Sequence, residues 1–107
     1  MIFLGNDHGG YRLAIRLYER MIQRYMQVTH HGCVTADLST DYPVFAKRVC
    51  DAVAEIEQHY RGILVCGTGI GMSMAANKHY NIRAALCERP SDAKLAREHN
   101  NANVLCL

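Results

Sequence analysis

The stretch that decides the fold is an apolar run followed by a glycine-rich turn, Gly62-Ile63-Leu64-Val65-Cys66-Gly67-Thr68-Gly69-Ile70-Gly71. Such a run is typical of a central strand that is covered on both faces. Met72, Ala75 and Ala76 follow the turn at helical spacing. The stretch therefore predicts a strand, a tight turn and a helix, which is the repeating unit of a parallel sheet.

The same alternation continues on both sides of this stretch. We expect further strands at residues 2–5, 27–30, 82–87 and 104–107, and helices at 11–26, 42–60 and 90–100. In the first helix, Tyr25 is expected to share the apolar face with Ala14 and Met21. The alternation predicts a parallel sheet with right-handed crossovers. The fold class is therefore α/β, a three-layer α/β/α Rossmann-like sandwich around a five-stranded parallel sheet.

The composition is that of an ordinary globular domain and excludes several classes of protein. The chain has 107 residues and a net charge of only +2, which argues against binding to nucleic acid or to a membrane surface. No apolar run is long enough to span a bilayer, and the start of the chain lacks a signal-peptide pattern. Without repeats or linkers, residues 1–107 are expected to form a single domain.

The five cysteines are odd in number, dispersed and free of any Cys-x-x-Cys pair. This usage indicates reduced thiols in the cytoplasm and argues against a disulfide framework or a zinc site. We expect four of them to behave as small buried apolar side chains. No metal and no other cofactor is expected.

Open parallel sheets bind ligands beyond the carboxyl ends of their strands. Three segments should meet there: Asn6-Asp7-His8, the turn at 66–71, and Glu88-Arg89. The N–H groups of the turn and the helix that starts after it favour negative charge, including a thiolate at Cys66. The turn does not match the dinucleotide fingerprint and lacks the Lys of a P-loop.

Each of these residues also has a purely structural interpretation. A tight turn with a buried Cys66 explains the glycine stretch about as well when that stretch is taken alone. Asp7 and Asp41 could each cap the helix that follows. The hydroxyl of Thr68 could bond to the local backbone.

His99 and Asn100 end the helix before the last strand, so topology puts them at the opposite edge of the sheet from Cys66. A functional role for His99 would then require a second subunit, whereas the structural interpretation is a histidine favoured by a helix C-terminus. The remaining histidines show no ligand spacing, and we interpret them as surface residues: His30, His31, His59 and His79.

Five blocks carry a family resemblance: Asn6-Asp7-His8-Gly9-Gly10, Asp41-Tyr42-Pro43, residues 66–78, Ile82-Arg83-Ala84 and residues 97–104. Together they resemble ribose-5-phosphate isomerase B, in a family that also includes galactose-6-phosphate isomerase subunits. The likeness runs from the first strand to the last residue. Met72 stands where a second branch of the family places a catalytic Glu, so the sequence is similar to the cysteine branch.

The resemblance implies an aldose–ketose isomerase that needs no cofactor and acts on a phosphorylated pentose or hexose. Cys66 would transfer the proton between C1 and C2, and Thr68 and His99 would assist ring opening. The other implied substrate contacts are Asp7, His8, Gly67, Gly69, Ile70, Gly71, Ser73 and Asn100. His99 and Asn100 would act across the interface of a homodimer or a dimer of dimers.

Members of the family continue past the fifth strand with two helices whose arginines bind phosphate, whereas this sequence ends at Leu107. We therefore expect a C-terminally truncated domain in which oligomer contacts or a further segment cover the sheet beside its last strand. The leading hypothesis is a ribose-5-phosphate isomerase of the pentose phosphate pathway. The alternatives are a weakly active or inactive sugar-phosphate-binding remnant, an isomerase of allose or galactose 6-phosphate, and a nucleotide-binding module.

Overall fold

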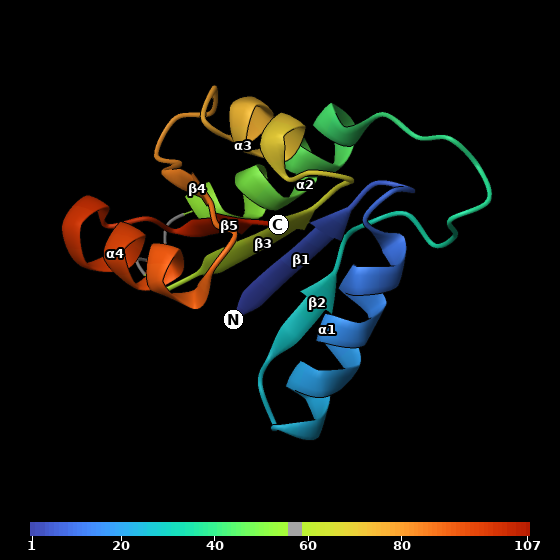
Figure 1. Cartoon of the computed structure of the whole chain (residues 1–107), viewed down its shortest axis with the longest axis horizontal. Coiled ribbons are helices and arrows are strands. Elements are labelled where there is room, and N and C mark those ends of the chain that lie inside the picture. The colour runs from blue at the N-terminus through green and yellow to red at the C-terminus, as the bar shows by residue number, and fades with distance from the viewer. Residues whose placement is uncertain (56–58) are drawn as a thin grey trace.

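The computed structural model describes residues 1–55 and 59–107. Over these residues five strands form one parallel sheet in the order β2-β1-β3-β5-β4 (Figure 1). The strands are β1 (Ile2–Asn6), β2 (Val28–His30), β3 (Arg61–Val65), β4 (Ala84–Leu86) and β5 (Val104–Cys106). The predicted α/β class is confirmed, and the polar strand β2 lies at an edge, as its composition indicates.

Four helices of the described chain connect these strands: α1 (Tyr11–Gln23), α2 (Tyr42–Ala54), α3 (Ile70–Ala76) and α4 (Pro90–Asn100). The connections that contain α1 and α4 run in one direction across the sheet, and those that contain α2 and α3 run in the other. Because such crossovers are right-handed, α1 and α4 cover one face while α2 and α3 cover the other (Figure 1).

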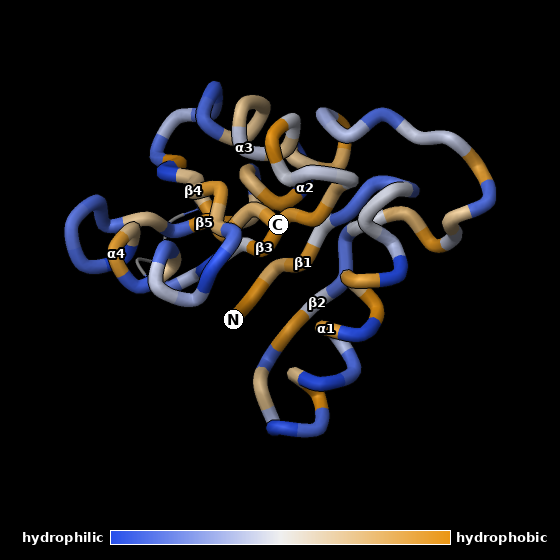
Figure 2. Tube along the Cα trace, viewed as in Figure 1, coloured by the Kyte–Doolittle hydropathy of each residue, from blue (hydrophilic) through white to orange (hydrophobic). Residues whose placement is uncertain are grey.

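The larger part of the core lies between the sheet and the helices α2 and α3. Val49 and Cys50 of α2 and Met72 of α3 pack there against Leu64 of β3 and Cys106 of β5. Figure 2 shows the corresponding contrast in hydropathy between the apolar central strands and the polar turns around α4. Strand β3 therefore ends inside a packed environment, which fixes the position of the residues that follow it.

The first helix ends earlier than predicted, and the placement of Tyr25 was wrong. Helix α1 ends at Gln23, and Tyr25 is 97% exposed with a left-handed φ of 58°. The N–H of Met26 bonds to the carbonyl of Met21, which turns the chain out of the helix and toward β2. The apolar spacing continued for one residue beyond the turn that closes the helix.

The second helix also ends earlier than predicted, at Ala54. Tyr60, which was expected on its apolar face, instead packs edge-on against Phe3 of β1, with ring centroids 5.3 Å apart. Ile56, expected on the same face, lies outside the described residues. The apolar spacing therefore continued from the helix to the residue just before β3.

None of the described helices is long and apolar enough to cross a membrane.

Candidate active site

Cys66 is the first residue after β3 and lies at the carboxyl edge of the sheet. Its N–H donates to the carbonyl of Leu107 at 3.1 Å, which holds the residue beside the end of β5. The N–H of Gly69 donates to the Cys66 Sγ at 3.1 Å. Gly69 has a φ of +76°, and an added β-carbon would lie 2.6 Å from the side chain of Leu86. A glycine is therefore required to place this N–H against the sulfur, where it favours negative charge.

Cys66 differs from the other cysteines in exposure. It is half-buried, whereas Cys33, Cys50, Cys87 and Cys106 are buried, which confirms the expectation for four of the five. Burial raises the pKa of the Cys50 and Cys106 thiols to about 12, with a smaller contribution from Asp51 at Cys50 and from neighbouring cysteines at Cys106. The sulfur that can meet a solute is therefore that of Cys66, and the interpretation of Cys66 as a fully buried turn residue is wrong.

The turn after Cys66 also presents backbone donors. Within the described part of the chain, the N–H groups of Gly67, Thr68 and Gly71 have no hydrogen-bond partner. Three unpaired donors around one loop form a cradle for an oxyanion or another anionic oxygen. The sulfur and these donors share the loop, so a bound molecule can meet both.

Two hydroxyl groups of the loop bond locally. The Thr68 Oγ1 accepts from the N–H of Ile70 at 3.3 Å, as the structural interpretation predicted. That bond leaves the proton of the Thr68 hydroxyl free to be donated. The Ser73 hydroxyl donates to the carbonyl of Ile70 at 2.8 Å, which ties Ser73 to its own helix.

The turn after β1 lies beside this loop. The N–H of Asp7 donates to the carbonyl of Val65 at 3.2 Å, and a β-carbon on Gly9 would lie 3.3 Å from the Gly67 nitrogen. Asp7 is buried, and its Oδ1 accepts from the N–H of Gly10 at 2.9 Å. Asp7 therefore closes the turn before α1, whose N-cap is Gly10, so the prediction that Asp7 caps the helix is wrong. The turn itself stands next to the cysteine loop.

The ring of His8 is held by the loop between β2 and α2. The backbone N–H of Thr40 donates to His8 Nδ1 at 3.0 Å, and the backbone N–H of His8 donates to Thr40 Oγ1 at 2.9 Å. Because a backbone N–H can only donate, Nδ1 carries no proton and the proton of the neutral ring is on Nε2. His8 therefore offers an N–H donor to a ligand.

His99 and Asn100 lie at the opposite edge, as topology predicts. They end α4, after which Asn103 accepts at its carbonyl from the N–H of Gly62, near the start of β3. Cys66 follows the last residue of the same strand. The structure therefore brings Asp7 and His8 to Cys66 but separates His99 and Asn100 from it by the length of β3.

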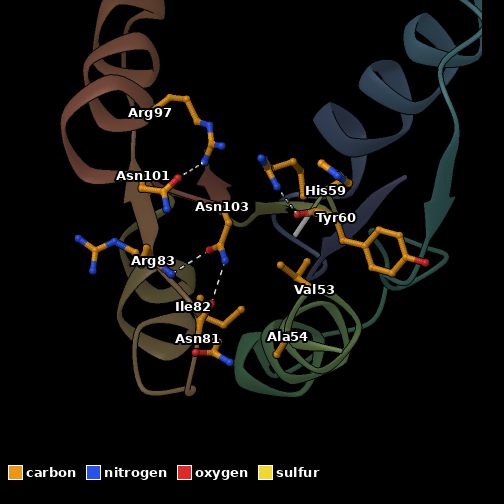
Figure 3. A pocket seen from close by; sticks show the side chains of 11 residues that line it. Val53, Ala54, His59, Tyr60, Asn81, Ile82, Arg83, Arg97, Asn101 and Asn103 are labelled. Carbon is orange, nitrogen blue, oxygen red and sulfur yellow. Dashed lines mark hydrogen bonds between the residues drawn. The ribbon is translucent and has the colours of Figure 1, made fainter. Parts of the chain in front are cut away.

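The amino edge contains a cavity of about 890 Å³, which Figure 3 shows from close by. Arg61, Arg97, Asn101 and Asn103 are among the residues that line it. Arg97 donates to the Asn101 Oδ1 at 2.8 Å, and burial together with the charge of Arg97 lowers the pKa of Arg61. The cavity is thus polar and positively charged, and it lies at the same edge of the sheet as His99 rather than at the edge that holds Cys66.

Three residues of the carboxyl edge received no individual role from the sequence: Asn6, His30 and Thr40. The Asn6 side chain is 0% exposed, and His30 Nε2 lies 2.6 Å from its Oδ1. His30 is therefore half-buried and bonded within the fold, which its interpretation as a surface residue did not predict. A polar residue at the end of a buried strand was the available signal, but its partners are distant in sequence.

Among the described residues, no cluster of His, Cys, Asp or Glu could hold a metal ion.

Known proteins resemble this chain in sequence and in fold. The family model for Ribose/Galactose Isomerase matches residues 2–107. The chain belongs to this family. Ribose-5-phosphate isomerase B of Escherichia coli strain K12 is 43% identical to it over 97% of this chain and 68% of the relative's own length.

Solved structures of ribose/galactose isomerases superpose closely on the chain. The Clostridium thermocellum ribose-5-phosphate isomerase B has a TM-score of 0.93 at 44% identity, over 99% of this chain and 70% of its own. The Mycoplasma genitalium enzyme, solved with bound ribulose-5-phosphate, has a TM-score of 0.94 at 43% identity, over the same shares of the two chains. The resemblance of the five sequence blocks is thereby confirmed.

Proposed function

We propose that the chain is an aldose–ketose isomerase that interconverts ribose 5-phosphate and ribulose 5-phosphate, with Cys66 as the base. The observation that carries this proposal is the half-buried Cys66, whose sulfur accepts the Gly69 N–H and shares one loop with three unpaired backbone donors. The names of the relatives point to the same reaction. An isomerisation of this type needs a base and a site for oxyanion charge, both of which the loop contains.

In the proposed mechanism the Cys66 thiolate takes the proton from C2 of the open-chain aldose, and the electron pair moves onto the carbonyl oxygen to give an enediolate. The N–H groups of Gly67, Thr68 and Gly71 stabilise that charge. The proton of the O2 hydroxyl then moves to O1, the thiol returns its proton to C1, and the carbonyl forms at C2, which gives the ketose and restores the thiolate. Asp7 and the Nε2–H of His8 hold the sugar hydroxyl groups.

His99 and Asn100 complete the site from a second copy of the chain in a homodimer, alone or within a dimer of dimers. His99 and Thr68 open the sugar ring by moving a proton between the ring oxygen and the anomeric hydroxyl. The support for this arrangement is the separation of His99 from Cys66 by the length of β3 within one chain. The positively charged cavity at the same edge of the sheet as His99 suits a phosphorylated substrate.

The further assignments concern cellular setting and substrate. We place the enzyme in the cytoplasm, because its five free cysteines suit a reducing compartment. The reaction that the names of its relatives give places it in the pentose phosphate pathway. Residues 1–107 form the isomerase domain. The family description names galactose as well as ribose, so a 6-phosphohexose is the second candidate substrate.

The proposal is tested by measuring turnover of ribose 5-phosphate, allose 6-phosphate and galactose 6-phosphate in a coupled assay. Cys66→Ala should lower kcat by about 10³-fold, because a positioned base contributes roughly 10²–10⁴ to such a rate. Cys50→Ala, at a buried cysteine of α2, is the matched control and should retain activity. Stabilisation by a sugar phosphate without turnover would identify a binding remnant instead, and stabilisation by nucleotides alone would identify a nucleotide-binding module.

A further inference from the structure

The end of β1 holds a buried polar side chain for which the proposed reaction has no use. Asn6 is 0% exposed and lies immediately before Asp7. Its Nδ2 donates to the carbonyl of Asp7 at 3.0 Å and lies 3.2 Å from the Cys33 Sγ. Its Oδ1 lies 2.6 Å from His30 Nε2. Because an amide oxygen only accepts, His30 donates this bond and carries a proton on Nε2.

These bonds join three segments that are distant in sequence. They connect the end of β1, the end of β2 and the loop at residues 31–41 that precedes α2. Gly32 crosses directly over Asn6, where an added β-carbon would lie 1.9 Å from the Asn6 Oδ1. The loop is therefore shaped around the Asn6 amide, and a side chain at Gly32 would displace it.

The contacts continue from this junction to the candidate site. Cys33 Sγ donates to the carbonyl of Thr35 at 3.3 Å. Further along the same loop, Thr40 bonds to His8 through both its N–H and its hydroxyl. The backbone bond from the Cys33 N–H to the Asn6 carbonyl holds the start of the loop. The Asn6 side-chain amide also donates to the Asp7 carbonyl, which holds the peptide bond between Asp7 and His8.

We propose that the buried Asn6 and the half-buried His30 form a positioning pair that sets the Asp7–His8 turn and, through the loop at 31–41, the ring of His8. Neither residue touches the substrate. His30 holds the Asn6 amide in one orientation, and that amide holds the Asp7 peptide and Cys33. This inference rests on the proposed function, because Asp7 and His8 are assigned there to bind the sugar.

The first test separates substrate binding from chemistry. His30→Leu and Asn6→Leu should each raise KM for ribose 5-phosphate about tenfold while kcat changes less than about twofold, because the turn binds the sugar and Cys66 carries the proton. His30→Gln should restore KM to within about twofold of the unmodified enzyme, since its amide can donate to the Asn6 Oδ1 as Nε2 does. The double variant should resemble either single variant, because the two residues act as a unit.

His79→Leu, at a half-buried histidine in the turn after α3, is the matched control and should leave KM unchanged. An unchanged KM in His30→Leu, an additive double variant, or equal defects in His30→Leu and His30→Gln would overturn the pair. A purely structural role would lower thermal stability in both His30 variants without the difference in KM.

The second test needs no turnover and therefore separates this inference from the proposed function. Nitrogen NMR of the His8 ring should show the Nε2–H tautomer in the unmodified protein and in His30→Gln. His30→Leu and Asn6→Leu should show a mixture of tautomers, because the Thr40 N–H is no longer held against Nδ1. An unmodified protein with this tautomer and no isomerase activity would refute the proposed function alone. A tautomer that stays fixed in both Leu variants would refute the pair.

Discussion

The two edges of the sheet position their polar groups by different kinds of hydrogen bond. At the carboxyl edge, backbone N–H groups do most of the positioning: Gly69 bonds to the Cys66 sulfur and Gly10 bonds to Asp7. At the amino edge, long exposed side chains bond to one another, as in the pair of Arg97 and Asn101. The first edge is therefore positioned largely by its backbone, and the second by side chains.

This difference teaches which part of the site one chain can complete by itself. The β–α turns bring Cys66, Asp7 and His8 together because all of them follow strand ends at the same edge. His99 ends the helix that returns to the opposite edge. No rotation of a side chain can cross the length of a strand, so the two groups meet only if a second copy contributes one of them.

The largest expected effect concerns the pairing of the two edges between subunits. Cys66→Ala and His99→Gln should each have little activity alone. Co-refolding them in equal amounts should restore about a quarter of the unmodified activity, because about half of the random dimers combine both variants and each of these has one intact site. The measurement is the initial rate in the coupled assay.

Refolding each variant alone under the same conditions is the control for this mixture. If the mixture is no more active than the sum of its parts although mixed dimers are present, His99 does not act across the interface. That outcome would remove the functional link between the two edges.

The second prediction concerns thiol reactivity at the carboxyl edge. In the native protein, iodoacetamide should alkylate Cys66 at least about 10²-fold faster than Cys50 or Cys106, because the latter are buried and protonated. Mass spectrometry of peptides after timed labelling measures the rates. Labelling in urea is the control, in which all five sites should react. Native labelling of Cys106 at the rate of Cys66 would contradict the described burial.

The third prediction tests whether the amino edge is energetically separate from Cys66. The Asn103 Oδ1 accepts from the Arg83 N–H, and its Nδ2 donates to the Asn81 carbonyl, each at 2.8 Å. Asn103→Ala should lower the free energy of unfolding by about 1–2 kcal/mol, as the loss of two such bonds predicts. Urea unfolding measures this change, and Lys94→Ala, at an exposed ion pair of 3.8 Å, should change it little. A slower alkylation of Cys66 in Asn103→Ala would show that the edges are coupled.

The smallest expected effect is a pH dependence of stability at the carboxyl edge. Burial, and to a lesser extent His31, lower the pKa of His30 in the folded protein. The unfolded chain therefore takes up a proton first as the pH falls, so the contribution of His30 is complete above about pH 6.5 and is lost below it. Between about pH 7 and pH 5, the unmodified protein should lose more stability than His30→Gln. Parallel urea curves for the two proteins would contradict this.

Prediction from the sequence was strongest where local pattern and packing agree. The apolar run before Cys66 predicted the central strand β3, and the alternation of elements predicted the sheet. It failed at helix ends, because the apolar spacing of Tyr25 and Tyr60 continued after the backbone had left the helix. Periodicity reports which residues seek burial, whereas a turn is closed by a few backbone bonds that leave little trace in composition.

The residues of the candidate site also fall into two groups, those that the local sequence pattern predicted and those that only packing placed. The sequence by itself determined the order of strands and helices, and therefore which residues follow strand ends: Asp7, His8 and the loop from Cys66. Only the tertiary structure decided that Thr40 holds the ring of His8, and that His30 is a partner of Asn6 rather than a surface residue. The reason is physical. Strand order follows from burial patterns within short windows, but a hydrogen bond between residues 24 or 32 positions apart depends on how the connecting loop packs.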